Sequence, residues 1–524
     1  MSADRIDPST EKIQRPVPPP DVRFNRLIVV VLFIALFAMA VRTPADTDLW
    51  WHLGAGRAIV TTGHIPYADE FSFTVRGKPW VDVYWLAQVG MYTVRQMGGD
   101  ALLAICVAGL AVAAFAFVYP QMEGGPFLRA FIIVLAATAS SVIWSPRLQM
   151  LSFVLLAVTG YIVYLWKWRR INRLWVLIPL YVLWANMHGG YALGLMLMGA
   201  VWVGEVLNRM TGRATAPGVM SWKAIGLLVA VGVLCGLALL VNPYTWGTWA
   251  LPFRTIGIKA LQGAIQEWAS PDFHNLYEQP MLWLLFGLLA AVGLSGRGWD
   301  WSDLMVVLIF GYSAFLARRN IAPLALVIAP VLARQAAPIV EAVSSRIRLP
   351  LLARQDLKPG LPSVLNGLIV ILVAVAALLK CGLALSPRMI DEARRQTVPV
   401  RAVEWMKQNH AAGPMYNSYN WGGYLVWALP DMPVFVDART DLYDDGFLQE
   451  YFQIMFVRPG GTSPLPIKGT LGVGDWQAVL DRRDVRLALT ERDSWLATML
   501  ATQPEWRLAY SDDQAVIWVR ERAK

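Results

Sequence analysis

The sequence predicts an α-helical protein that crosses a membrane many times and ends in a small α/β domain outside it. Three observations predict this class. Of the 524 residues, 56% are hydrophobic and only 16% are charged, a balance that soluble chains of this length do not have. Apolar runs separated by short loops follow one another over residues 27–385. The composition then changes, and residues 386–524 alternate short strands with polar helices, as soluble domains do.

The N-terminal part of the chain supplies the predicted spans. Residues 1–26 are polar, proline-rich and basic, and we expect them to form a disordered tail in the cytoplasm. Arg26 and Arg42 flank the first apolar run, and their side chains can reach the membrane surface. About eleven runs approach the length of roughly 20 residues that a spanning helix needs. They are Leu27–Val41, Ala101–Tyr119, Phe131–Trp144, Leu148–Trp166, Leu174–Met187, Tyr191–Val206, Ile225–Val241, Met281–Leu294, Leu304–Ala317, Ile321–Leu332 and Leu365–Leu385.

The basic residues predict how these helices are oriented. The net charge of +9 comes from Lys and Arg in short loops between the runs, which is typical of membrane topology and not of a nucleic-acid-binding surface. With the N-terminus in the cytoplasm, eleven spans place three basic loops on the cytoplasmic side: Lys167–Arg173, Arg209–Lys223 and Arg334–Lys358. The loops 43–100 and 242–280 and the domain 386–524 then lie outside. We expect the inner membrane of a bacterium.

One polar segment and the C-terminal domain complete the expected organisation. Val81–Met97 contains charged and amide side chains, so we expect a helix on the membrane surface rather than a span. The domain is expected to be a small open sheet covered by helices. Its expected strands are Met415–Ser418, Val434–Asp437, Val485–Leu489 and Ala515–Arg520, and its expected helices are Val400–Asn409, Gly446–Met455, Trp476–Arg483 and Ser494–Thr502.

The first long loop carries the densest group of candidate functional residues. Asp46 and Asp48 form an Asp-x-Asp pair just after the first span, and Asp69 and Glu70 form a second acidic pair. A carboxylate fixed at a membrane surface can act as a general base. A structural alternative exists for both pairs: either aspartate can cap a helix over Leu49–Val60, and the second pair can belong to an ordinary loop.

The residues of the same loop leave open whether it binds a metal ion. His52 lies four residues after Asp48, so both side chains can face one side of a helix. Aspartate and histidine are metal-compatible ligands, but two of them do not define a divalent-cation site. The three cysteines all fall inside apolar runs, which argues against a disulfide framework and a cysteine metal site. No phosphate-binding glycine loop of the nucleotide-binding types is present.

Spaced residues in this loop match a known pattern. They are Asp48-Leu49-Trp50-Trp51-His52, Arg57, Gly63, Pro66, Gly77-Lys78-Pro79 and Tyr84-Trp85. In them the loop resembles the first external loop of GT-C glycosyltransferases, above all the lipid A aminoarabinose transferases and the protein O-mannosyltransferases. The family's catalytic aspartate matches Asp48, and the lysine of its Lys-Pro pair matches Lys78. The chain departs from the family at Leu49, where a second acid is common, and at Trp51, where a basic residue is common.

The resemblance implies a reaction. GT-C enzymes of this kind move a sugar from a polyprenyl-phosphate donor to a lipid, glycan or protein acceptor outside the cytoplasm, with inversion. By that analogy, Asp48 is the general base, and Asp46 or Glu70 orients the acceptor or a metal. Cations stabilise the departing lipid phosphate. The candidates for that role are Lys78, Arg318 and Arg319.

Other candidate residues lie at span ends or in the second long loop. Arg147, Arg318 and Arg319 stand outside, against the charge trend; their guanidinium groups suit phosphate, although extension of the side chains to the membrane surface explains them equally. His188 can bind phosphate, metal or acceptor, or make a structural hydrogen bond in a turn. Glu267, followed by a tryptophan, can contact sugar or belong to a folded lid.

The C-terminal domain has one such group. Asp437, Arg439 and Asp441 follow an apolar strand directly, at the position where open α/β sheets bind ligands. They are candidates for recognition of the acceptor or a glycan. A salt-bridged loop is the alternative.

Two other classes of function stay open beside a glycosyltransferase. A transporter or flippase for lipid or glycan usually has ionisable residues at mid-membrane depth, whereas Glu205 and Lys380 lie toward span ends. A catalytically inactive GT-C-like scaffold that binds glycan is the second alternative, and the departure after Asp48 favours it.

Overall fold

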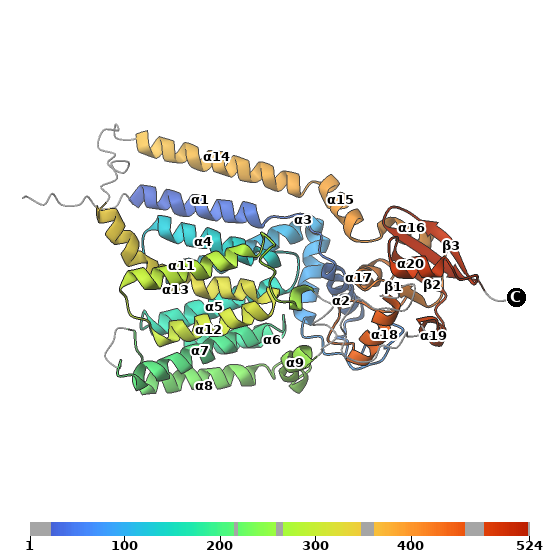
Figure 1. Cartoon of the computed structure of the whole chain (residues 1–524), viewed down its shortest axis with the longest axis horizontal. Helices are drawn as coiled ribbons and strands as arrows, with labels where there is room; N and C mark the ends of the chain where they lie inside the picture. Colours follow the sequence, from blue (N-terminus) through green and yellow to red (C-terminus); the bar gives the residue numbers. More distant parts are fainter. Residues whose placement is uncertain (1–21, 214–217, 258–265, 347–360, 456–475, 522–524) are drawn as a thin grey trace, which may run out of the picture.

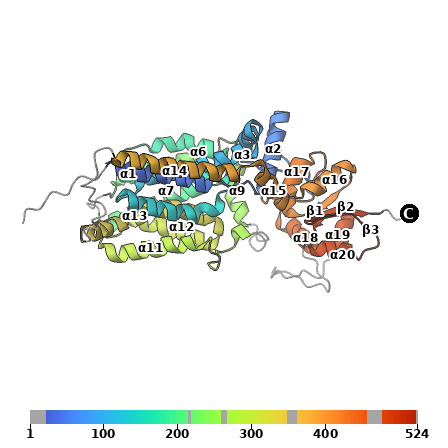
Figure 2. The ribbon, with the colours of Figure 1, turned by 90° about the horizontal axis from the view of Figure 1, so that it is seen from above.

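The computed structural model describes residues 22–213, 218–257, 266–346, 361–455 and 476–521. A bundle of apolar helices and a smaller α/β domain lie end to end (Figure 1), and the chain finishes at the tip of the domain (Figure 2). We call the end of the bundle beside this domain the domain end, and the opposite end the far end. Of the expected tail, residues 1–21 lie outside the described part, whereas 22–26 are already helical.

Each of the eleven expected spans coincides with an apolar helix, so the prediction of a polytopic helical membrane protein is confirmed. Among the described residues, six helices are long and apolar enough to cross a membrane, and five shorter apolar helices pack beside them. The helices are α1 (Val22–Ala40), α3 (Trp85–Val118), α4 (Pro126–Ser140), α5 (Gln149–Lys167), α6 (Leu177–Ala185), α7 (Tyr191–Met210), α8 (Trp222–Ala238), α11 (Gln279–Ser295), α12 (Trp301–Leu316), α13 (Ile321–Arg346) and α14 (Leu361–Ala384).

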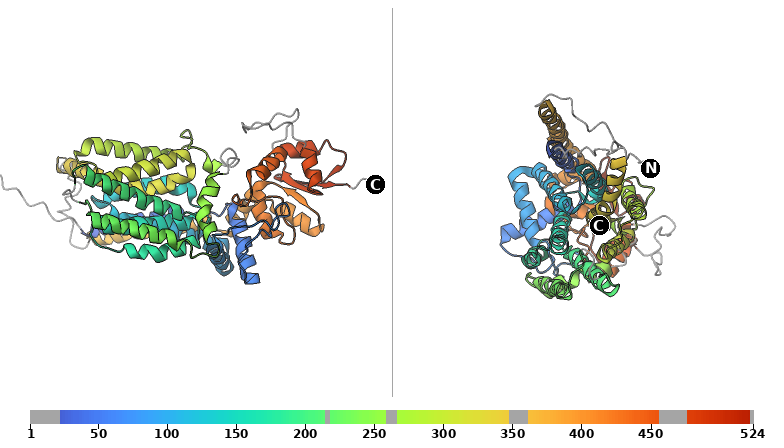
Figure 3. Two further views of the ribbon diagram at one scale, coloured as in Figure 1. Left: turned by 90° about the horizontal axis from the view of Figure 1, so that it is seen from below. Right: turned by 90° about the vertical axis from the view of Figure 1, so that its left-hand side faces the viewer.

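The bundle is built around α13. Its alanines Ala322, Ala325, Ala329 and Ala333 are buried at helical spacing, and small side chains let neighbouring helices approach closely in a membrane. The neighbours include α4, α5, α11 and α12. By contrast, α14 packs mainly against α1, at the edge of the bundle (Figure 3). Its outward side chains are large and apolar, as lipid-facing side chains are.

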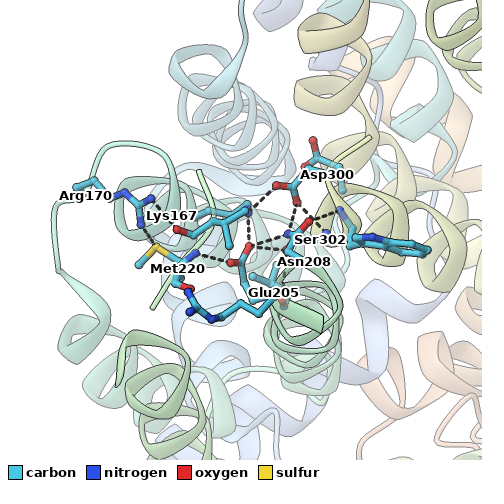
Figure 4. Close-up of polar contacts among 12 residues, drawn as sticks. Lys167, Arg170, Glu205, Asn208, Met220, Asp300 and Ser302 are labelled. Carbon is cyan, nitrogen blue, oxygen red and sulfur yellow. Dashed lines mark hydrogen bonds and ion pairs between the residues drawn. The ribbon is translucent and has the colours of Figure 1, made fainter. Parts of the chain in front are cut away.

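A buried polar cluster closes the far end, and we call it the far-end cluster. It joins the last turn of α5, the last two turns of α7 and the start of α12 (Figure 4). Lys167 forms ion pairs with Glu205 and, at 3.0 Å, with Asp300. Glu205 also accepts hydrogen bonds from the Ser302 hydroxyl at 2.8 Å and from the Met220 backbone N–H at 2.7 Å. The basic loops meet here as expected, since Arg170 of one donates to the Val219 carbonyl of the next at 2.9 Å.

Three helices lie at the domain end. They are α2 (Asp48–Thr62), the first part of α3, and α9 (Trp246–Gly257). Gly98 and Gly99 interrupt α3 with non-helical backbone, and Gly99 has φ +64°, a conformation that glycine adopts without strain. The segment before this break includes most of Val81–Met97, and it runs beside α2 across the end of the bundle (Figure 1). The expectation of a helix outside the spans is therefore met for residues 85–97.

The α/β domain has a four-stranded sheet in the order β1-β2-β4-β3. Strands β1 and β2 are parallel, and the other two pairs are antiparallel. The expected strand Val434–Asp437 is wrong as a regular strand, because Val434 makes only isolated bridges, to Met415 and Ser72. The elements are α15 (Pro387–Thr397), α16 (Val400–Gln408), β1 (Met415–Asn417), α17 (Tyr419–Ala428), α18 (Asp445–Met455), α19 (Trp476–Arg482), β2 (Leu487–Glu491), α20 (Trp495–Leu500), β3 (Trp506–Ser511) and β4 (Ala515–Arg520).

The first long loop and the α/β domain share one hydrophobic core. Trp51 and Trp80 of the loop are buried together with Phe435 and Tyr443 of the domain. Helix α2 packs on α17, and Gly54 allows this contact, because a Cβ there would lie 2.7 Å from a methyl group of Val426. The loop that carries the candidate residues is therefore fixed between the bundle and the domain.

Candidate functional site

Three acidic side chains from separate parts of the chain converge on Arg147. Asp46 precedes α2, Asp48 begins it, and Glu267 lies in the short helix η4 (Gln266–Trp268) of the second long loop. Arg147 lies between α4 and α5. Its Nε donates to Asp46 Oδ2 at 2.5 Å, and its Nη1 lies 3.3 Å from Asp48 Oδ2 and pairs with Glu267. We call these four residues the domain-end cluster, and all four were expected site residues.

The two aspartates have different roles in this cluster. Asp46 Oδ1 accepts the backbone N–H of Asp48 at 2.9 Å, so Asp46 supports the start of α2, as the structural alternative proposed. Asp48 does not cap the helix in this way. Its side chain stays 28% exposed, against 8% for Asp46. Of the two aspartates, Asp48 is therefore the one with the more accessible carboxylate.

Asp48 has a raised pKa. Burial raises the pKa of this carboxyl to about 7; Arg147 opposes the rise, while Asp46 and Glu267 add to it. Burial lowers the pKa of Arg147, but the three carboxylates more than reverse this and leave it raised. Arg147 is thus a fixed cation, and Asp48 can exchange a proton near neutral pH.

A cavity of about 300 Å³ lies near the cluster; none of the four cluster residues lines it, but Arg319 of its wall acts on the charge of Asp48. Gln149 and Trp268, which follow Arg147 and Glu267 closely in sequence, are part of its wall. Apolar side chains from α5, α7, α9 and α13 form part of its lining. The polar and aromatic lining residues are Tyr84, Gln149, Ser152, Phe153, His188, Trp268, Arg319, Asn320, Thr440 and Asp441.

His188 lines this cavity as a neutral side chain. Burial, and then the charge of Arg319, lower its pKa to about 3. Its Nδ1 lies 2.7 Å from the Ser152 hydroxyl and accepts the Gly190 backbone N–H at 2.9 Å. Because Nδ1 accepts, Nε2 carries the proton and is the ring's hydrogen-bond donor. The turn hydrogen bond expected as an alternative exists, and it orients the ring.

His52 is buried rather than available to a ligand. Its ring stacks on Trp51 with 3.6 Å between the ring centres, and its Nδ1 lies 3.4 Å from the Gln88 amide nitrogen. Burial, with smaller contributions from His188 and Arg147, holds the pKa of His52 well below its usual value. His52 is therefore a neutral side chain that packs beneath the site.

Of the three expected phosphate-binding cations, Arg319 lines the cavity and has no ion-pair partner among the described residues. Lys78 lies away from the cavity wall and pairs with Asp444 at 2.9 Å. Arg318 pairs with the buried carboxylate of Glu278 at 2.6 Å. Arg319 lines the cavity and lies over the Trp268 ring, 4.8 Å from its centre. Among the ion pairs of the described residues, none includes Arg319.

The second acidic pair of the loop lies apart from the cluster. Asp69 is buried, accepts the backbone N–H groups of Phe71 and Ser72, each at 3.1 Å, and pairs with Arg439 at 2.6 Å. Asp69 therefore holds its own loop against the α/β domain. This agrees with the structural alternative given for the second acidic pair, that it belongs to an ordinary loop. Glu70 beside it is exposed.

One carboxyl group near the cavity, that of Asp82, was not among the expected site residues. Asp82 is fully buried and accepts a hydrogen bond from Gln88 at 2.9 Å, but its Oδ2 has no partner in the described part of the protein. Burial, and then the charge of Asp441, raise the pKa of Asp82 to about 8. Composition alone does not separate Asp82 from other loop acids, because its distinguishing feature is burial.

The site does not fit a divalent cation. Among the described residues, no group of three His, Cys, Asp or Glu side chains is placed to hold one. The three carboxylates of the domain-end cluster instead surround Arg147, so a guanidinium group supplies the positive charge.

Similar folds occur among solved structures, although no protein-family model and no curated protein matches the chain. The chain shares its overall fold with the following structures. The archaeal oligosaccharyltransferase AglB from Archaeoglobus fulgidus, in complex with an inhibitory peptide and a dolichol-phosphate, aligns with a TM-score of 0.55 and 11% identity over 90% of this chain and 69% of that one. Its apo form gives 0.53, with 11% identity over 90% and 70%.

A bacterial GT-C glycosyltransferase is also similar. ArnT from Cupriavidus metallidurans, bound to undecaprenyl phosphate, aligns with 14% identity over 94% of this chain and 97% of that one, at a TM-score of 0.48. The resemblance expected from the first long loop is thus confirmed at the level of the fold, and the AglB structures carry that conclusion.

Proposed function

We propose that the protein transfers a sugar from a polyprenyl-phosphate donor to an acceptor hydroxyl, with Asp48 as the general base. The observation that carries this proposal is the Asp48 carboxyl, which Arg147 holds near a cavity lined by both apolar and polar residues, one of which, Arg319, acts on the charge of that carboxyl. We place the domain end outside the cytoplasm, at the inner membrane of a bacterium.

The chemistry needs one proton transfer and one leaving group. The acceptor oxygen attacks the anomeric carbon while Asp48 takes its proton, which is the work of a general base with a pKa near the working pH. The bond from the anomeric carbon to the phosphate oxygen breaks on the opposite face, so the configuration inverts. The lipid phosphate leaves with the electron pair of that bond.

Arg319 is the cation that we assign to the leaving phosphate. It reaches the cavity from the short helix η5 (Arg318–Asn320), at the start of α13. Its neighbour Arg318 is neutralised by Glu278, and Arg147 is surrounded by carboxylates. A guanidinium group without a carboxylate partner can form charge-assisted hydrogen bonds to phosphate oxygens. His188 Nε2–H is a second donor in the same cavity.

The proposal is tested with purified protein in lipid nanodiscs and a panel of polyprenyl-phosphate sugars. We would follow release of the free lipid phosphate and, separately, binding of each donor. Loss of general-base catalysis by Asp48→Asn should lower the release rate by about 10²- to 10⁴-fold, with donor binding retained. Asp513→Asn is the matched control, because Asp513 is exposed on the α/β domain and pairs with Arg401.

Each other outcome has a definite meaning. Donor binding without turnover by the wild type would replace the transferase with a carrier or an inactive scaffold. Full activity of Asp48→Asn would remove Asp48 as the base. Absence of binding across the whole panel would reject polyprenyl-phosphate sugars as donors.

A further inference from the structure

The cavity is completed by the α/β domain. Most of its wall comes from the helical bundle, but Thr440 and Asp441 belong to the segment between α17 and α18. This segment stays in place because Asp437 and Asp69 hold Arg439, which is almost fully buried. The bundle alone therefore leaves one wall of the cavity missing.

Asp437 and Asp441 flank Arg439 in sequence but differ in what their carboxylates can do. Asp437 binds Arg439 through both oxygens, at 2.7 to 3.1 Å, and is fully buried. Its bonding capacity is used within the fold. Asp441 is half-buried and faces the cavity, and among the described residues no ion pair includes it. The salt-bridged-loop alternative thus describes Asp437 and Arg439. Asp441, by contrast, makes no ion pair among the described residues; its carboxylate accepts its own backbone N–H and lies under the electrostatic influence of Arg439 and Arg254.

The other groups of the cavity indicate what Asp441 can bind. Arg319 provides a positive charge for an anionic group, and Asp441 provides an acceptor for hydroxyl groups. The aromatic rings of Trp268 and Tyr84 and the amide of Gln149 also line the wall. A ligand with a phosphate at one end and a polyhydroxylated ring beside it matches both charges, because sugar hydroxyls donate to carboxylates and apolar ring faces pack on aromatic side chains.

We propose that Asp441 is a substrate-binding residue that accepts hydrogen bonds from sugar hydroxyls, so that the α/β domain takes part in sugar recognition. The proposal deepens the proposed function, and the identity of the phosphate-bearing ligand rests on it. The sugar can belong to the donor or to a glycan acceptor. The chemistry at Asp441 is the same in both cases, and the ligands used in the test separate the two.

The test measures binding to the full chain in nanodiscs with three probes. They are bare polyprenyl phosphate, polyprenyl-phosphate sugars, and methyl glycosides of the same sugars. Asp441→Asn should weaken at least one sugar-bearing probe by about tenfold, the loss expected for a hydrogen bond to a charged group, and should leave bare polyprenyl phosphate unchanged. Asp444→Asn is the control, because Asp444 lies three residues further on and is 66% exposed.

The pattern of losses decides the source of the sugar. A loss confined to the polyprenyl-phosphate sugars assigns Asp441 to the donor, and a loss with the methyl glycosides assigns it to an acceptor. Equal binding of every probe by Asp441→Asn and wild type would overturn the proposal. So would an equal loss with all three probes, which would indicate a disturbed fold, and so would a wild type that binds no sugar-bearing probe.

Failure of the proposed function gives a different result. It appears as a wild type that does not bind polyprenyl phosphate or does not release it from donors. Glycoside binding that depends on Asp441 would survive that outcome, and the α/β domain would still be a sugar-binding domain.

Discussion

The two ends of the helical bundle each contain a cation surrounded by acids, and they differ in how completely these groups are buried. In the far-end cluster, the side chains of Lys167 and Glu205 are 3% and 0% exposed, and Asn208, Ser302 and backbone groups occupy the remaining sites (Figure 4). In the domain-end cluster, Asp48 and Glu267 are 28% and 39% exposed beside a cavity.

The difference separates a structural use of charge from a chemical one. A buried ion pair whose hydrogen-bonding capacity is filled can fix helices relative to one another, even where, as in the far-end cluster, Lys167 and Ser302 line a cavity. A carboxyl with a pKa near 7 and an open side can exchange protons and bind ligands. Charge content alone does not distinguish the two ends. The two ends differ in how deeply their charged groups are buried and in whether the hydrogen-bonding capacity of those groups is filled.

Breaking the far-end cluster should affect stability most. Lys167→Met leaves Glu205 and Asp300 without their cation, and removing one partner of a buried pair costs about 3–5 kcal/mol. We expect a lower midpoint of thermal unfolding in nanodiscs, with the rate per folded molecule unchanged. A large fall in that rate at equal folded fraction would show that the far end takes part in the reaction.

Breaking the domain-end cluster should affect the reaction instead. Arg147 lowers the pKa of Asp48, so Arg147→Met should raise it and move the acid-side limb of the pH–rate profile to higher pH. The loss of stability should be smaller than for Lys167→Met, because Asp48 and Glu267 are partly exposed. Profiles of both proteins over pH 5–9 would check this, and an unmoved limb would contradict the assigned role of Arg147.

The wild-type pH profile gives a third measurement. Asp48 acts as a base only when deprotonated, so the rate of lipid phosphate release should rise with pH through about 7 and then level off. Below that pH, the protonated carboxyl cannot accept the acceptor's proton. Asp48→Asn should remove this limb from whatever rate remains. The same limb in Asp48→Asn would assign it to another group.

The apolar runs made the fold predictable, whereas the site depends on contacts between distant segments. The positions of eleven helices and of Asp48 at the start of α2 follow from local sequence. The pairing of Arg147 with Asp46 joins residues 101 positions apart, and periodicity does not reveal such a contact. The expected strand at Val434 failed for a related reason, because its partners are split between Ser72 of the first loop and Met415 of the domain.

Contacts between distant segments also explain why some candidate residues lie away from the site. Asp69 looks like Asp48 in sequence, since each follows an apolar or aromatic segment and stands close to another acid. Only the fold shows that Arg439, which is 370 positions away from Asp69, occupies its carboxylate. Asp441 became a candidate binding residue for the same reason. Only the fold shows that it lines the cavity and makes no ion pair among the described residues.

Lys78 offers the smallest expected effect and the clearest test of sequence against structure. The family pattern assigns it to the lipid phosphate, whereas the structure pairs it with Asp444, and the two side chains are 35% and 66% exposed. Exposed ion pairs contribute about 0–1 kcal/mol, so Lys78→Ala should change the unfolding midpoint little. It should change the affinity for bare polyprenyl phosphate less than twofold, while Arg319→Gln should weaken it about tenfold. If the two variants exchanged these effects, the leaving phosphate would lie at Lys78, against the α/β domain, and the assignment of Arg319 would be wrong.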